Sequence, residues 1–589
     1  MSKYTVEKNV QILISLLKQY GIKRIIASPG TANMSFVASM QIDSFFEIYS
    51  SVDERSAAYM ACGMAAETGQ PVVITCTEAT ASRNYMPGLT EAYYRKLPVL
   101  AVMTSHGDFL VGSYEPQCID NRVVPNDIVK FDTHIHQCKD KQDERTITVR
   151  INEALNQLFT YGGGPVRILL ESRNPGNLSV EQLPHAKIIK QVNNPNDLPE
   201  LPKGDIAIFV GSHLQWNREE VAIVEKFCES NNSVVLCDLT SNYPGKYRIN
   251  FSLIATQEGF VDMVRNPKLI IYIGCVTGDY YTSDFCRLAE KTWFVSKDGK
   301  YRDRFNNLDL VATMEESEFF SQYLCESHET SYHNELKALY EKVFCAIPEL
   351  PLSNLWIAQQ SSRIVPQNCE IHAAINNSLR SWNYFELPHN VIGSCNVGGY
   401  GIDGGMSTMI GASTVSPHKL FFCIIGDLAF FYDVNVIGNR HVGNNVRILL
   451  INNGVGQEFR NYQHPAFKLG KEANKYIAAS GHFGNKSLSL VKGMAESFGY
   501  KYMKAESKEE FLSYYEDFFS DKVSDKPILF EVFTNSDDEN KALDTLRHLF
   551  PKIETTKDKI KSAAKDTIKT IVKKTLTEDN ISQIKSLLH

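Results

Sequence analysis

Short apolar runs that alternate with helical stretches recur in three blocks along the chain. Each run is rich in Ile, Leu, Val or Phe and is bounded by Gly, Asn or other polar residues, as strands buried on both faces of a parallel sheet are. The runs are 23–28, 71–77, 97–105, 206–212, 233–239, 269–275, 421–427, 447–453 and 527–533. This alternation predicts an α/β chain with three doubly wound parallel-sheet domains.

The domain boundaries follow from the chain length and from breaks in this pattern. A single core stops growing near ~250–300 residues, so a chain of this length needs several domains. Pro and polar residues interrupt the alternation at 177–187 and 348–354. The predicted domains are 1–180, 185–350 and 351–540, followed by an amphipathic helical tail over 541–589.

The predicted tail is basic on one side. From residue 557 onward, lysines alternate with apolar residues at near-helical spacing. Such a helix could lie on an anionic membrane or dock on a partner. We favour packing on its own subunit, because Trp and Phe are absent from the apolar face.

The composition excludes several classes of protein. With 43% hydrophobic residues, 22% charged residues and a net charge of −7, the chain is typical of a soluble globular protein and lacks the basic bias of a nucleic-acid binder. We expect no signal peptide, because the first residues lack an apolar h-region and a cleavage site, and no apolar run reaches the ~20 residues of a membrane span. The cysteines are scattered without a C-x-x-C pair, so we expect a cytoplasmic protein.

Polar residues close two neighbouring apolar runs of the third block. Gly426 and Asp427 follow one run, and Asn453 follows the next, 26 residues after Asp427. The segment between them, 430–442, has the length of one crossover helix. Both side chains should therefore lie at the carboxyl ends of adjacent strands, where open α/β sheets bind ligands. Such oxygen ligands suit Mg²⁺ held together with a phosphate group.

A second motif lies in the first block. Glu54 closes a short apolar stretch and precedes a helix of small residues, SAAYMACGMAAETG. A carboxylate at this junction could hold a proton on a ligand nitrogen. The alternative is that Asp53 and Glu54 form an acidic helix cap favoured by the helix dipole.

Together these motifs resemble those of the thiamine diphosphate-dependent enzymes. The Gly-Asp pair and Asn453 are similar to their diphosphate and metal motif, and VDERSAAYMACGMA resembles the segment that carries their activating glutamate. Within this superfamily the likeness is strongest to the menaquinone-pathway (MenD-like) synthases of 2-succinyl-5-enolpyruvyl-6-hydroxy-3-cyclohexene-1-carboxylate. The shared phrases are SPG, DERSAA, CT-x-x-T-A, N-Y-x-P-x-x-x-E-A-Y-Y, GIDG-x-x-ST and GDLAF.

The resemblance implies thiamine diphosphate and Mg²⁺ as cofactors. Asp427, Asn453 and the backbone carbonyl of Val455 would bind the metal, and Gly426 would let the backbone approach the diphosphate. Ile402 would wedge the cofactor into its bent shape, although an ordinary core position is the commoner fate of an isoleucine. The first domain would bind the pyrimidine ring and the third the diphosphate.

The resemblance also implies a reaction and an assembly. Glu54 would favour the imino tautomer that takes the thiazolium C2 proton, and Gln117 would face the cofactor. The resulting ylide would attack a 2-oxo acid and pass an acyl carbanion to an acceptor. A simple decarboxylase and a non-catalytic scaffold are the alternatives. Because the glutamate and the metal motif come from different subunits in this superfamily, we expect a homodimer or homotetramer.

The substrate positions depart from the menaquinone pattern. Where those enzymes have S-R after SPG, this chain has Thr31, Ala32 and Asn33, and their T-A-D-R-P is replaced by TSHGDF at 104–109. Their S-N-R-G-A-S-G-I-D-G becomes SCNVGGYGIDG. Arginine is the natural partner of carboxylates, so we expect an acceptor other than isochorismate.

Other polar residues are candidates for substrate contact. TEAT replaces T-S-G-T and places Glu78 near the cofactor, and Arg460 is the best remaining carboxylate binder. His106 lies just past a strand end and could act as an acid or base, although a surface loop is the reading that we favour. The candidate substrate residues are Thr31, Asn33, Glu78, His106 and Arg460.

Overall fold

The computed structural model describes residues 3–173, 176–326, 330–481 and 487–552. It contains three six- or seven-stranded sheets, and every strand pairing within them is parallel. The α/β fold class expected from the sequence is thus confirmed. The rest of the predicted tail, 553–589, lies outside the described residues.

The first sheet has the strand order β3-β2-β4-β5-β7-β6. The strands are β2 (Arg24–Ala27), β3 (Glu47–Ser50), β4 (Val72–Cys76), β5 (Val99–Ser105), β6 (Phe131–Ile135) and β7 (Val166–Glu171). The helices are α1 (Lys8–Gln19), α2 (Met34–Gln41), α3 (Glu54–Thr68), α4 (Thr80–Asn84), α5 (Met86–Arg95) and α6 (Lys141–Gln157). A short antiparallel pair, β1 (Tyr4–Thr5) and β8 (Leu178–Val180), lies apart from this sheet.

Small residues let α3 pack closely on α5. A Cβ atom added to Gly88 would lie only 2.4 Å from the Cβ atom of Ala58. The Cys62 thiol donates to the carbonyl of Gly88 at 3.2 Å. The small-residue helix that follows Glu54 is therefore held tightly against its neighbour, which fixes the position of its first turn.

The second sheet has the order β12-β11-β10-β13-β14-β15-β9. Its strands are β9 (Lys190–Val192), β10 (Ile206–Val210), β11 (Ser233–Cys237), β12 (Arg248–Asn250), β13 (Leu269–Ile273), β14 (Lys291–Val295) and β15 (Leu308–Ala312). The helices around it include α7 (Arg218–Asn231), α8 (Ser252–Ala255), α10 (Tyr280–Cys286), α11 (Glu316–Ser321) and α12 (Ser331–Cys345).

The third sheet has the order β17-β16-β18-β19-β21-β20. Its strands are β16 (Glu370–Ala373), β17 (Ile392–Ser394), β18 (Phe421–Gly426), β19 (Val446–Asn452), β20 (Lys501–Ala505) and β21 (Ile528–Phe533). Its helices include α13 (Asn354–Ser361), α14 (Asn377–Asn383), α15 (Gly405–Val415), α16 (Asp427–Tyr432), α20 (Lys508–Phe518) and α21 (Ser536–Arg547).

The crossover between β18 and β19 differs from the single helix expected over 430–442. It consists of α16 and a 3-10 turn, η4 (Val434–Gly438), separated at Asp433. The Asp433 carboxylate accepts hydrogen bonds from the backbone N–H and the hydroxyl of Ser407, at 2.7 and 2.5 Å. This contact with α15 holds Asp433 in a non-helical conformation, so the helix ends there.

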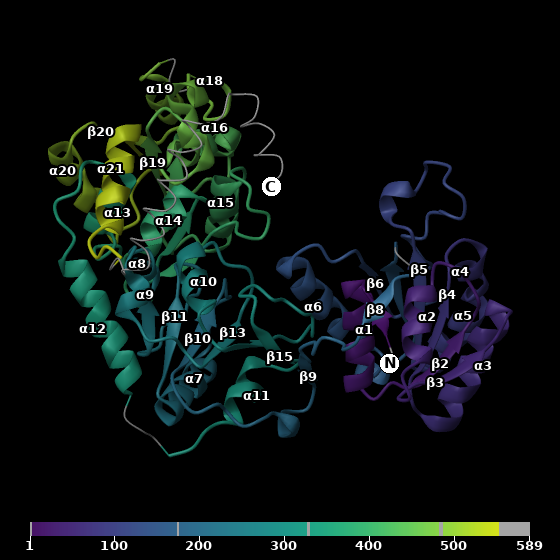
Figure 1. The fold of residues 1–589 in the computed structure, drawn as a ribbon. Coiled ribbons are helices and arrows are strands. Elements are labelled where there is room, and N and C mark those ends of the chain that lie inside the picture. The colour runs from purple at the N-terminus through teal and green to yellow at the C-terminus, as the bar shows by residue number, and fades with distance from the viewer. Residues whose placement is uncertain (1–2, 174–175, 327–329, 482–486, 553–589) are drawn as a thin grey trace, which may run out of the picture.

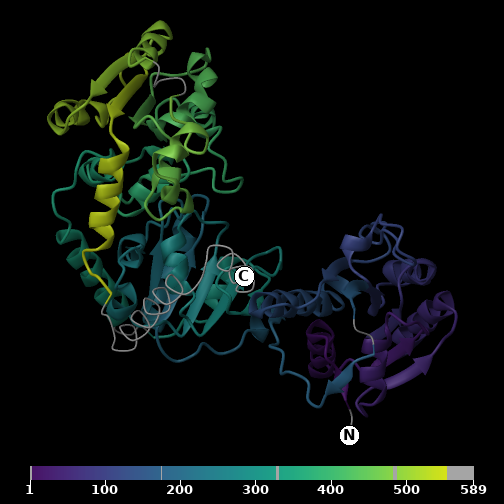
Figure 2. The ribbon, with the colours of Figure 1, turned by 45° about the horizontal axis from the view of Figure 1, so that its top comes forward.

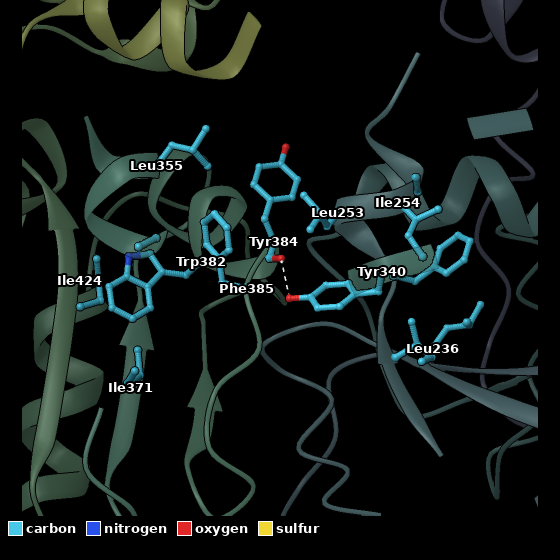
Figure 3. Close-up of a cluster of buried hydrophobic side chains, with 14 of the residues drawn as sticks. Leu236, Leu253, Ile254, Tyr340, Leu355, Ile371, Trp382, Tyr384, Phe385 and Ile424 are labelled. Carbon is cyan, nitrogen blue, oxygen red and sulfur yellow. Dashed lines mark hydrogen bonds between the residues drawn. The ribbon is translucent and has the colours of Figure 1, made fainter. Parts of the chain in front are cut away.

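The second and third sheets share one hydrophobic core (Figure 3). Trp382 lies on α14, and Tyr384 and Phe385 follow this helix. All three share a cluster with Leu236 and other apolar residues of the second sheet's layer. The hydroxyl of Tyr340, on α12, donates to the carbonyl of Tyr384 at 3.3 Å. These two layers therefore form one block.

The first sheet and its helices lie to one side of this block (Figures 1 and 2). They have their own core and reach the second sheet's layer through α6. Arg145 forms an ion pair with Asp303, and Asn156 donates to the Tyr301 hydroxyl at 2.7 Å. Within one chain, α3 and α16 lie far apart, in separate parts of the molecule (Figure 1).

No helix in the described ranges is both long enough and apolar enough to cross a membrane.

Candidate active site

Asp427 and Asn453 lie where the sequence predicts, at the carboxyl ends of β18 and β19. The two strands pair in parallel from Phe421 with Val446 to Gly426 with Ile451. Asp427 begins α16 and is 6% exposed. Its carboxylate accepts hydrogen bonds from the backbone N–H groups of Leu428 and Gly454, each at 2.8 Å. The loop after β19 is thereby fixed against the start of α16.

A cavity of about 160 Å³ opens beside these residues. Asp427, Asn453, Val455, Gly426 and Ile402 all contribute to its wall, as the resemblance implies for a cofactor site. A Cβ atom built on Gly426 meets no other atom within 4 Å, so the backbone there faces open space. The whole lining comes from the third sheet's layer, between residues 354 and 459.

The electrostatics of Asp427 suit a bound cation. Burial, aided by the negative charge of Glu531, raises the pKa of Asp427 to about 6, although three backbone N–H groups favour the ionised form. A buried carboxylate is stabilised when it coordinates a metal ion. The amide oxygen of Asn453 and the carbonyl of Val455 lie on the same loop, so the residues present fit a hard cation with oxygen ligands.

Glu54 and Asp53 have separate tasks at the start of α3. The Asp53 carboxylate caps the helix by accepting from the backbone N–H of Arg55 at 3.0 Å. The half-buried Glu54 side chain instead accepts a hydrogen bond from Asn84, at the end of α4, at 3.2 Å. The cap expected as the alternative role is therefore filled by Asp53, which leaves Glu54 free for another task.

Glu78 and His106 come together at the same edge of the first sheet. Glu78 follows β4 and is 4% exposed. Its carboxylate contacts the Nδ1 atom of His106 and accepts a hydrogen bond from that residue's backbone N–H at 3.3 Å. Cys118 donates its thiol to the same carboxylate oxygen at 3.4 Å. His106 is thus not a simple surface residue, and the contact with Cys118 was not foreseen from the sequence.

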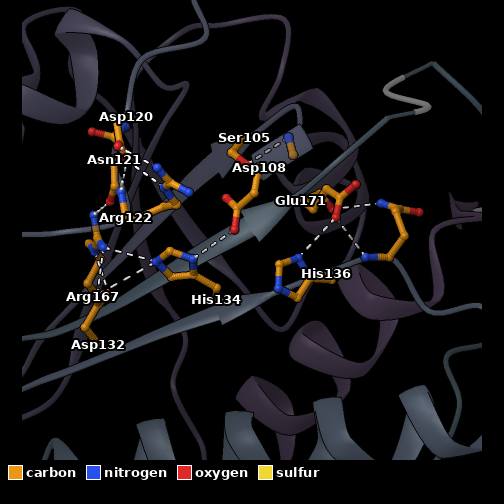
Figure 4. A network of polar contacts seen from close by, with 12 residues as sticks. Ser105, Asp108, Asp120, Asn121, Arg122, Asp132, His134, His136, Arg167 and Glu171 are labelled. Carbon is orange, nitrogen blue, oxygen red and sulfur yellow. Dashed lines mark hydrogen bonds and ion pairs between the residues drawn. The ribbon is translucent and has the colours of Figure 1, made fainter. Parts of the chain in front are cut away.

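Gln117 lies in the long loop between η1 (Asp108–Leu110) and β6. Polar contacts of Asn121 fasten this loop to the sheet (Figure 4). Arg167, on β7, is 1% exposed and donates to the carbonyl of Asn121 at 2.7 Å while it pairs with Asp132. The Asn121 amide donates to the Ser82 hydroxyl at 2.8 Å. Gln117 is exposed and has a positive φ of 66°, a conformation that asparagine or glycine adopts more readily.

Two of the remaining substrate candidates, Asn33 and Arg460, bind backbone carbonyls. Buried Asn33 donates to the carbonyl of Ser28 at 2.9 Å, whereas Thr31 is exposed. Arg460 donates to the carbonyl of Gly470. Their roles toward a substrate stay predictions.

A cation near the cavity was missed from the sequence. Arg380, on α14, pairs with both carboxylate oxygens of Glu458, at 3.0 and 2.9 Å, and Glu458 lines the cavity. Arg380 lies on a helix that follows a strand of the third sheet, and this position was the signal in the sequence that could have identified it.

Two family models match this chain. The N-terminal TPP binding domain of thiamine pyrophosphate enzymes matches residues 8–122, and their C-terminal TPP binding domain matches residues 376–532. The chain therefore contains both TPP binding domains of the thiamine pyrophosphate enzymes. Glu54 lies in the first matched domain, and Asp427 and Asn453 lie in the second. With both TPP binding domains, it is an enzyme that uses thiamine diphosphate with a divalent metal, as predicted.

Several curated proteins are similar to this enzyme along most of its length. A protein of Bacteroides thetaiotaomicron is 29% identical over 570 residues, which cover 92% of this chain and 99% of that protein. A protein of Phocaeicola vulgatus is 28% identical with the same coverage, and one of Flavobacterium johnsoniae is 26% identical over 80% of this chain and 88% of its own. All three are named 2-succinyl-5-enolpyruvyl-6-hydroxy-3-cyclohexene-1-carboxylate synthase.

Proposed function

We propose that this thiamine pyrophosphate enzyme is a Mg²⁺-dependent 2-oxo-acid decarboxylase and carboligase. The observation that carries the proposal is the pair of oxygen ligands, Asp427 and Asn453, beside a cavity bordered by Gly426 and Ile402. When bound, thiamine diphosphate supplies an electron sink for the acyl group of a decarboxylated 2-oxo acid. A scaffold protein would have no need of these residues together with Glu54.

The chain's own residues bind and orient the cofactor. Asp427, Asn453 and the Val455 carbonyl hold the metal, and hard oxygen ligands with few protein groups favour Mg²⁺. Ile402 limits the conformation of the cofactor from the cavity wall. Glu54 keeps a proton on the aminopyrimidine ring, and Asn84 orients its carboxylate through the 3.2 Å hydrogen bond.

The active unit in this proposal is a homodimer, alone or within a tetramer. The helices α3, which begins at Glu54, and α16, which begins at Asp427, lie far apart in one chain (Figure 1). A second copy can bring its first domain to the cavity of the third. We further propose that the enzyme acts in the cytoplasm, since its cysteines are scattered and many are buried.

The acceptor in this proposal is not isochorismate, and the product therefore differs from the one in the relatives' names. Two arginines that could replace the missing cations already bind backbone carbonyls, Arg83 that of Asp120 at 3.0 Å and Arg460 that of Gly470. Each lost charge-assisted hydrogen bond costs roughly 1.5–3 kcal/mol, so three losses weaken binding by several orders of magnitude.

Release of CO₂ from a panel of 2-oxo acids tests this function. With Mg²⁺ and thiamine diphosphate, we expect release from at least one acid and faster release when a suitable acceptor aldehyde or ketone is added. We expect no isochorismate consumption with 2-oxoglutarate. Release that acceptors leave unchanged would favour a simple decarboxylase, and no release from any acid would contradict the proposal. Isochorismate consumption at a dedicated synthase's rate would overturn the substrate assignment alone.

A further inference from the structure

Three side chains with metal-binding chemistry meet at the carboxyl edge of the first sheet. Glu78 follows β4, His106 follows β5 directly, and Cys118 lies in the loop after the short 3-10 turn η1 (Asp108–Leu110). One carboxylate oxygen, one imidazole nitrogen and one thiol sulfur lie within 4.8 Å of one another. We propose that Glu78, His106 and Cys118 bind a divalent metal ion of the zinc type, separate from the metal at Asp427.

The donor atoms suit this kind of ion. Zinc binds carboxylate, imidazole and thiolate ligands in tetrahedral sites, whose ligand atoms lie about 3.3–3.8 Å apart. The sulfur of Cys118 lies 3.4 Å from the Glu78 oxygen, and the His106 nitrogen contacts that oxygen too. A mixed nitrogen, oxygen and sulfur set is poorly suited to Mg²⁺, which prefers oxygen ligands.

The charge around the cluster favours a cation. Buried charges are normally paired or bound to a metal ion. In the described part of the chain, neither Lys nor Arg forms an ion pair with Glu78; its ionic contact there is with His106. Glu115 adds a further negative charge near Cys118. A divalent ion would neutralise the buried carboxylate.

The thiol of Cys118 would change state when the metal binds. In the structure the thiol donates to the Glu78 carboxylate at 3.4 Å. Zinc-type ions bind the thiolate, so binding displaces this proton and is tighter at higher pH.

The ligand loops are held in place independently of the metal. Arg167 and Ser82 fasten the loop that carries Cys118 through Asn121, as Figure 4 shows for Arg167 and Asn121. Three protein ligands leave a fourth position of a tetrahedral ion open, as in catalytic zinc sites. On the proposed function, that position takes a carboxylate or carbonyl oxygen of the substrate, at the segment 104–109 where the relatives' arginine is absent. This last step rests on the proposed function, whereas metal binding does not.

Titration with Co²⁺ tests the site. Cobalt occupies zinc sites, and the absorption spectrum of the bound ion shows which kinds of ligand atom coordinate it. The full-length protein is stripped of metal, kept without thiamine diphosphate and given excess Mg²⁺ to occupy the Asp427 site. We expect a thiolate-to-cobalt charge-transfer band that saturates at about one equivalent per chain, and its loss on addition of Zn²⁺. Cys118→Ser should abolish the band, whereas Cys345→Ser, at an exposed cysteine of α12, should leave it.

Glu78→Gln gives a second, nearly isosteric variant, with circular dichroism to verify folding. It should weaken Co²⁺ binding at least tenfold and retain the charge-transfer band at saturation, since Cys118 remains. Absence of the band in the wild type, or a band that persists in Cys118→Ser, would overturn the metal site and leave a metal-free hydrogen-bonded cluster. Because the readout needs neither cofactor nor turnover, its failure is distinct from failure of the proposed decarboxylase activity.

Discussion

Asp53 and Glu54 are adjacent carboxylates with different surroundings. Asp53 bonds to the backbone of its own helix, and Glu54 reaches Asn84 on another helix. We predict that Glu54→Gln slows deuterium exchange at the C2 atom of bound thiamine diphosphate, and turnover with it, by about 10²–10⁴-fold, as for loss of an acid–base group. Cofactor affinity should change little.

Asp53→Asn is the matched control, one residue away and with the same change from carboxylate to amide. Asparagine caps helices about as well as aspartate, so α3 should keep its stability and exchange should keep its rate. Rapid-quench exchange followed by NMR of the released cofactor measures both variants. An unchanged exchange rate in Glu54→Gln would remove this residue from the proposed mechanism.

At the residue scale, the sequence predicts contacts between strand ends better than contacts between loops. Asp427 and Asn453 could be placed together because each directly follows one of two consecutive apolar runs. The contact of Glu78 with Cys118 depends on the path of a long loop, which Arg167 fixes from a distant strand. Hydrophobic periodicity carries no information about such a path.

At the scale of elements, β16 contains a buried histidine whose charge would be costly. His372 is 1% exposed, and its Nδ1 atom lies 2.9 Å from the Ser394 hydroxyl on β17. Burial lowers the pKa of His372 to about 4, against an ordinary value of 6.5. At a pH between these two pKa values, the unfolded chain binds a proton at His372 that the folded chain does not. The stability of the folded state therefore falls as the pH drops from 6.5 toward 4.

Between pH 7 and pH 4.5, the free energy of unfolding should fall by roughly 2–3 kcal/mol less in His372→Gln than in the wild type. Hydrogen exchange of β16 and β18 peptides, compared between variant and wild type at each pH, measures the local stability. His418→Gln, at an exposed histidine of the same layer, should leave the pH dependence unchanged. A parallel pH dependence in wild type and His372→Gln would contradict the prediction.

The strands that coincide with the nine apolar runs were predictable to within one or two residues, whereas short strands such as β12 and β17 were not. The run 447–453, for example, is β19 at 446–452, and its residues are buried without interruption. The crossover after β18 was not predictable, because Asp433 is held by Ser407 from another helix. The local hydrophobic pattern therefore predicts the strands with apolar runs, whereas a contact between residues distant in the sequence decides where α16 ends.

At the scale of the molecule, one chain separates the two halves of the proposed site. The third sheet's layer packs on the second through a common core, while the first lies to one side (Figure 2). No pattern in the sequence encodes this arrangement; only the resemblance implied that the glutamate and the metal ligands come from different subunits. A symmetric dimer would form two equal sites, each from two chains.

Subunit complementation tests this arrangement directly. Glu54→Gln and Asp427→Ala chains should each be inactive alone, since every site in either homodimer lacks one residue. In a mixed dimer, one site combines the intact Glu54 of one chain with the intact Asp427 of the other. With random pairing, half of the dimers are mixed and half of their sites are intact, so co-expressed chains should recover about a quarter of wild-type CO₂ release. A mixture that stays inactive, although tagged purification shows that mixed dimers form, would require each site to be built within one chain.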